Sequence, residues 1–126
     1  MAWCFDDDAT GYSVSVLKRL DSEDAIAPSI WPLEIVNTLL VAERSKQFDQ
    51  RRSAAFIRLL ETLPVSVIAD QAADIFHSVA TLAREQTISS YDASYVRLAV
   101  REGTPLATID GGMRGACQRL GVTLLV

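Results

Sequence analysis

The sequence has few of the residues that cross-link small secreted domains or bind soft metal ions. Its 126 residues include two cysteines and one histidine. Cys4 and Cys117 lie far apart, and His77 has no cysteine or histidine at the spacing of a zinc ligand set. We therefore expect two reduced thiols and no zinc site. A chain of this length can bury a hydrophobic core without disulfides.

The sequence also lacks an apolar run long enough to cross a membrane. Its first residues, MAWCFDDD, have neither the basic start nor the apolar stretch of a signal peptide. We therefore expect a cytoplasmic protein with no membrane partner. Hydrophobic residues make up 49% of the chain and charged residues 22%, which is typical of a globular protein. We expect one domain over residues 1–126.

The chain also has no excess of positive charge: 12 lysines and arginines stand against 16 aspartates and glutamates, and the formal net charge is −4. This balance argues against a broad basic surface for nucleic acid. It leaves another route open, since a divalent cation held by carboxylates can meet a phosphate group locally.

The pattern of hydrophobic residues predicts alternating helices and strands. We expect helices over residues 8–20, 31–45, 49–63, 70–86, 89–103 and 111–121, and strands over residues 24–29, 65–68, 105–109 and 122–126. Such alternation is typical of an α/β fold in which helices flank a largely parallel sheet. The series opens on a helix, whereas a parallel α/β sheet normally starts with a strand. We therefore expect the first strand to be absent from this chain.

Three acidic residues are expected at one edge of this sheet. The helix that begins near Asp92 runs about 15 Å in one direction. The strand that ends before Asp110 returns over roughly the same distance, so the two aspartates should be neighbours. Glu34 lies early in the helix that follows the first predicted strand. The carboxyl ends of parallel strands are where open α/β sheets place their functional sites.

Three carboxylates held together repel one another unless a cation compensates. Their hard oxygen atoms suit Mg²⁺ or Mn²⁺, which also accept phosphate oxygens as ligands. A metal so placed can activate water for attack on a phosphodiester. The alternative is structural: Asp92 and Asp110 cap helices, and Glu34 is a first-turn acid that the helix dipole favours. Because the three acids are expected at one edge, we favour the metal-dependent phosphodiesterase.

Three segments carry a family resemblance. "WPLEIVNTLLVAE", "YDASYVRLA" and "LATID" closely resemble motifs of PIN-domain ribonucleases, specifically the VapC-type toxins of bacterial toxin–antitoxin pairs. The resemblance implies a PIN-like three-layer sandwich and an Mg²⁺- or Mn²⁺-dependent endoribonuclease. It implies catalytic and metal-binding roles for Glu34, Asp92 and Asp110, with Asn37 and Thr108 in support. The implied partners are an RNA substrate, a cognate antitoxin and a second copy of the chain.

The chain departs from the family pattern at its start. The resemblance implies a first strand that ends in a further aspartate, followed by residues like "AWCFDDD". We expect both the strand and that aspartate to be missing here, and we match Asp6, Asp7 and Asp8 to the acidic loop before the first helix. The alternative function is a catalytically impaired PIN-like module that dimerises and binds an antitoxin. A response-regulator receiver is disfavoured, because no lysine occurs after Lys46.

Overall fold

Five parallel strands form the central layer of the structure, a computed structural model that describes residues 1–3 and 10–125. The strands are β1 (Ala2–Trp3), β2 (Ala25–Pro28), β3 (Val65–Ile68), β4 (Leu106–Ala107) and β5 (Leu124–Leu125). Their order is β3-β2-β1-β4-β5, and every neighbouring pair is parallel. The predicted α/β class, with a parallel sheet flanked by helices, is confirmed.

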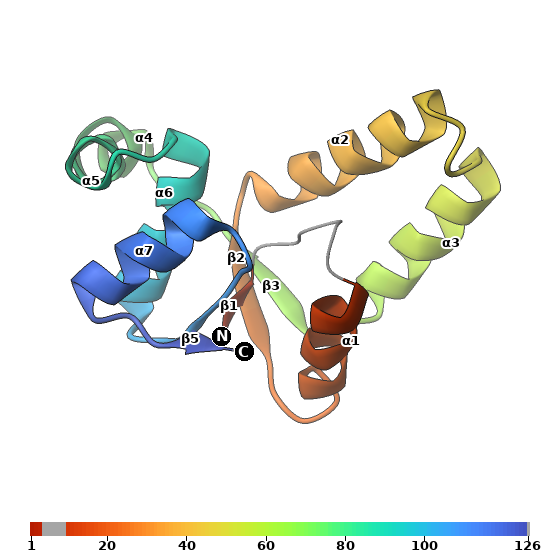
Figure 1. Cartoon of the computed structure of the whole chain (residues 1–126), viewed down its shortest axis with the longest axis horizontal. Helices are drawn as coiled ribbons and strands as arrows, with labels where there is room; N and C mark the ends of the chain where they lie inside the picture. Colours follow the sequence, from red (N-terminus) through yellow and green to blue (C-terminus); the bar gives the residue numbers. More distant parts are fainter. Residues whose placement is uncertain (4–9, 126) are drawn as a thin grey trace.

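Helices cover both faces of this sheet, which gives three layers (Figure 1). They are α1 (Thr10–Arg19), α2 (Trp31–Arg44), α3 (Gln50–Glu61), α4 (Ala72–Asp74), α5 (Ala80–Gln86), α6 (Ser90–Glu102) and α7 (Gly111–Leu120). Figure 1 shows α1 and α3 on one side of the strands and α4 to α7 on the other. Helix α2 leads away from the sheet and joins α3 at a turn far from it.

Residues that favour helix ends set the limits of α2, α6 and α7. The side chain of Ser89 caps α6 by accepting a hydrogen bond from a backbone amide of its first turn. Pro32 lies in the first turn of α2, where its missing N–H costs nothing. Gly103 and Gly121 end α6 and α7 at positive φ angles of 60° and 74°, which glycine adopts without strain.

The segment expected as one helix over residues 70–86 is divided in the structure. It begins at Ala72 rather than at Asp70, and one turn of π-helix, η1 (Ile75–Val79), separates α4 from α5. Asp70 does not cap the helix, because its carboxylate pairs with Arg101 of α6 instead. π-Helical turns occur frequently at functional sites.

The expectation that the first strand is absent was wrong. Ala2–Trp3 forms β1 at the centre of the sheet, where Ala2 pairs with both Ile26 and Leu106. The amide of Ala2 donates to the carbonyl of Pro105 at 2.9 Å, and the carbonyl of Met1 accepts from Ile26 at 2.7 Å. A strand of two residues is too short to show a period in the sequence, and these backbone bonds are what define it.

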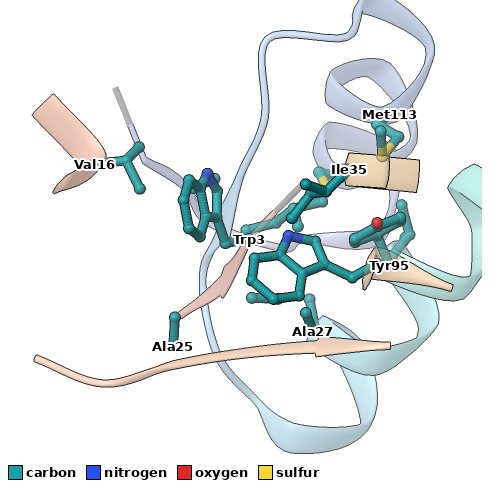
Figure 2. Packing of buried hydrophobic residues seen from close by; sticks show 14 of the residues in the cluster. Trp3, Val16, Ala25, Ala27, Ile35, Tyr95 and Met113 are labelled. Atoms are coloured by element: carbon teal, nitrogen blue, oxygen red, sulfur yellow. The ribbon is translucent and has the colours of Figure 1, made fainter. Parts of the chain in front are cut away.

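Trp3 joins this short strand to the main hydrophobic core. Its side chain is 2% exposed, and its ring centroid lies 5.8 Å from that of Trp31 in a tilted arrangement. Figure 2 shows Trp3 in the same cluster as Val16 of α1, Ile35 of α2 and Tyr95 of α6. The core therefore draws on helices from both faces of the sheet.

Cys117 is a buried free thiol of α7. Burial raises the pKa of this thiol, and the nearby positive charge of Arg114 opposes the rise. A buried thiol that stays protonated is chemically inert, as expected of a reduced core cysteine. Cys4 lies outside the described residues. Over residues 1–3 and 10–125, no helix has the length and apolar character that crossing a membrane requires.

We expect Trp3→Ala to lower the free energy of unfolding by about 3–5 kcal/mol, because it removes a large buried side chain from the central strand. Phe76→Ala is the matched control, since Phe76 is 73% exposed and its loss should change stability by less than about 0.5 kcal/mol. Urea unfolding followed by circular dichroism measures both variants. Similar losses in the two proteins would contradict the central role of β1.

Candidate active site

Glu34 is tied to α6 by a hydrogen bond from a buried tyrosine. It lies in the first turn of α2, directly after β2, and is half-buried. The phenol of Tyr95 donates a hydrogen bond to Glu34 Oε1. Because Tyr95 is only 1% exposed, its ring is held by the core and fixes the position of the carboxylate. An anionic acceptor makes such a bond stronger than one between neutral groups.

Asn37 lies one turn after Glu34 and shares its surroundings. Both residues line a cavity of about 450 Å³ together with Tyr91, the second residue of α6. Asn37 and Glu34 therefore face the same cavity. The cavity therefore lies between the first turns of α2 and the amino end of α6.

Asp110 caps α7. Its Oδ2 atom accepts a hydrogen bond from the amide of Met113 at 2.9 Å, and its own amide donates to Thr108 Oγ1 at 3.1 Å. Thr108 is fully buried, and its carbonyl accepts from the Arg114 guanidinium at 2.9 Å. The Thr108 hydroxyl therefore orients the backbone of Asp110.

The side chain of Asp110 lies near the start of α6. A Cβ atom added to Gly112 would be 3.2 Å from Asp110 Oδ2 and 3.4 Å from Ile88 Cγ2. Ile88 immediately precedes Ser89, the cap of α6. Glu34 and Asp110 therefore both lie near the first turns of α6.

Asp92 does not cap α6, so the structural alternative considered for this residue, a helix cap, was wrong. Ser89 is the cap, and Asp92 is the third residue of the helix, where it donates its backbone amide to Ser89 Oγ at 3.0 Å. An acid in the first turn still benefits from the helix dipole. The Asp92 side chain is half-buried and lies one turn before Tyr95, the residue that holds Glu34.

The donor chemistry of these acids fits a hard divalent cation, but their arrangement does not close around one. Within the described ranges, no three residues among histidine, cysteine, aspartate and glutamate form a group able to hold a metal ion. Asp6, Asp7 and Asp8 lie outside those ranges. The structure therefore places three carboxylates around the amino end of α6 without making them one compact ligand set, and we derive no reaction step through a metal.

The sequence patterns did not single out two residues of this region, Tyr95 and Asp70. Tyr95 looks like one more apolar residue of a core helix, and only its position one turn after Asp92 hints at a polar contact. Asp70 follows the carboxyl end of β3, so the same rule that singled out Asp110 applies to it. Its side chain is 7% exposed and pairs with Arg101 at 3.3 Å.

Comparison with known proteins supports the fold. No family model and no curated protein matches the chain. A solved structure does match, the crystal structure of PAE2754 from Pyrobaculum aerophilum, with a TM-score of 0.65 and 25% sequence identity. The match covers 92% of this chain and 87% of that one. The likeness therefore extends over nearly the whole sheet and its flanking helices.

Replacing Asp110 by alanine should show how much its helix cap contributes to the stability of the protein. We expect Asp110→Ala to lower the free energy of unfolding by about 1 kcal/mol, because the cap of α7 is lost. Asp110→Asn should cost only a few tenths of this, since asparagine is an equally good cap. Thermal melting of the two variants measures the difference. Equal losses would mean that Asp110 stabilises the fold through its charge and not through the cap.

Proposed function

We propose that the protein is a metal-dependent endoribonuclease that hydrolyses RNA phosphodiester bonds, the toxin of a toxin–antitoxin pair. The observation that carries the proposal is that Glu34, Asp92 and Asp110 lie around the amino end of α6, at the carboxyl edge of a parallel sheet. The resemblance of the three sequence segments to VapC-type PIN domains adds the reaction class. We assign Mg²⁺ or Mn²⁺ as the cofactor because carboxylate oxygens are the ligands that these ions prefer.

The proposal divides the assigned residues between metal binding and support of the site. Glu34, Asp92 and Asp110 supply the carboxylates that hold the cation. Asn37 lines the same cavity as Glu34 and offers an amide to the substrate. Thr108 holds the backbone of Asp110 through its hydroxyl.

A second candidate is a PIN-like interaction module with impaired catalysis, which dimerises and binds an antitoxin. It is favoured by the open arrangement of the acids, because the described residues form no group of three ligands for one ion. A cation that is held by fewer carboxylates is bound more weakly. Both candidates include a second copy of the chain and an antitoxin as partners, and these partners rest on the sequence resemblance alone.

We expect Asp92→Asn to abolish RNA cleavage that depends on Mn²⁺ while the protein stays folded. Asparagine has nearly the same shape but lacks the negative charge that a cation requires. The control is Asp49→Asn, because Asp49 caps the distant helix α3 and asparagine preserves a cap. Cleavage of a labelled RNA, with and without EDTA, measures activity, and circular dichroism measures folding.

The outcome separates the two candidates. Cleavage that EDTA stops and that only Asp92→Asn removes supports the nuclease. Full cleavage by the folded Asp92→Asn protein contradicts the assignment of Asp92. A folded wild-type protein that neither binds Mn²⁺ nor cuts RNA supports the interaction module instead.

Tyr95→Phe tests whether the buried phenol positions Glu34. The substitution keeps the ring in the core and removes the hydrogen bond to Glu34 Oε1, which should cost about 1–3 kcal/mol of stability. We expect affinity for Mn²⁺ to fall severalfold, because the Glu34 carboxylate is no longer held. Calorimetric titration with Mn²⁺ provides the measurement. A stability loss with unchanged Mn²⁺ affinity would show that Tyr95 has only a structural role.

A further inference from the structure

A second cavity, of about 270 Å³, adjoins the one that contains Glu34. Its walls come from the carboxyl ends of β2 and β3, the amino end of α6 and the π-helical turn η1. It shares Ile30, Leu33 and Tyr91 with the Glu34 cavity. The two cavities are therefore neighbours, and a ligand that reached from one to the other would pass Tyr91.

Asp70 gives this mostly apolar cavity one charged group. Its side chain is 7% exposed, and Oδ1 accepts a hydrogen bond from Arg101 at 3.3 Å. Over residues 1–3 and 10–125, no other hydrogen bond to this carboxylate is found. An ionised carboxylate offers about four acceptor positions and no donor. The buried group can therefore accept further hydrogen bonds from a ligand in the cavity.

Tyr91 gives the cavity an aromatic wall that solvent reaches. The residue is 60% exposed, so its ring is accessible to a ligand. Ile75 and Val79 of η1 supply apolar surface to the same cavity. Proteins that bind single-stranded RNA stack unpaired bases on exposed aromatic rings and read their edges by hydrogen bonds.

We propose that this cavity binds an unpaired guanine base, stacked on Tyr91 and hydrogen-bonded to Asp70. Guanine is the base whose Watson–Crick edge presents two adjacent donors, N1–H and the N2 amino group, to one carboxylate. Uracil places a carbonyl on each side of its single N–H, and these oxygens repel a carboxylate. Adenine and cytosine each offer an amino group beside a ring nitrogen that only accepts.

The proposal rests on the proposed ribonuclease function and adds a sequence preference to it. A base held beside Tyr91 directs the adjoining phosphate group toward the cavity of Glu34 and Asn37, because the two cavities share a wall. The protein should therefore cut single-stranded RNA next to guanine. Asp70 acts here as a specificity residue and takes no part in hydrolysis.

Binding of mononucleotides to the full chain tests the pocket without any need for activity. Guanosine, inosine and uridine 5′-monophosphates are titrated in turn and followed by protein NMR. Inosine monophosphate lacks the N2 amino group and keeps N1–H. We expect guanosine monophosphate to bind on the order of tenfold more tightly than inosine monophosphate, because a charged hydrogen bond is lost. Uridine monophosphate should bind more weakly still.

Two matched pairs of variants test whether Asp70 is responsible for the guanine preference and Tyr91 for the stacking. Asp70→Asn should remove the preference for guanosine monophosphate, while Arg101→Gln, which breaks the same ion pair but keeps the carboxylate, should retain it. Tyr91→Ala should weaken the binding of all three nucleotides, whereas Tyr91→Phe, which keeps the ring, should bind them as the wild-type protein does. Melting curves confirm that each variant is folded.

Equal binding of the three nucleotides, or an unchanged preference in folded Asp70→Asn, would overturn the pocket assignment. This outcome leaves the nuclease proposal intact if Asp92→Asn still abolishes cleavage. Conversely, a guanine preference that depends on Asp70 in a protein that cuts no RNA would support the pocket and contradict the nuclease.

Discussion

The pairing of β1 with its two neighbours is the interaction on which the rest of the structure depends. Among the strands of the described residues, whose order is β3-β2-β1-β4-β5, Ala2–Trp3 pairs with β2 on one side and with β4 on the other. Glu34 follows β2, whereas Asp110 follows β4. The two acids therefore follow strands that lie on opposite sides of β1. Buried backbone groups left unpaired at this position would cost free energy on both sides.

Helix α6 is the second constraint, because it packs against both halves of the sheet. Six of its residues are buried, and it contacts β1, β2 and β4. Its amino end lies beside all three candidate acids, and Tyr95 donates from within the core to Glu34. A helix so tightly packed has little freedom to move, so the groups at its amino end are held on a rigid element, as a functional site requires.

The sequence predicts the elements that have long patterns, and it fails where an element is short or where a contact forms only in the tertiary structure. The sequence predicts strand β3 with its observed bounds, Val65–Ile68, because three of its four residues are β-branched. Strand β1 was missed, because two residues carry no period. Glu34 and Asp110 were found through the rule for carboxyl ends of parallel strands. The hydrogen bond from Tyr95 to Glu34 could not be predicted in this way, because the two residues are 61 positions apart and meet only in the folded chain.

The cap that Asp110 forms and its proposed role as a ligand are compatible. The amide of Met113 occupies one position at Oδ2, and a carboxylate has about four acceptor positions in all. The same holds for Glu34, where Tyr95 uses Oε1 alone among the described contacts. In metal sites, such hydrogen bonds to a ligating carboxylate fix its orientation and are part of the site. The helix cap and the buried phenol are thus the contacts that would hold two ligands ready for an ion. The structural role of each acid, taken alone, does not argue against the metal-binding role that we propose for them together.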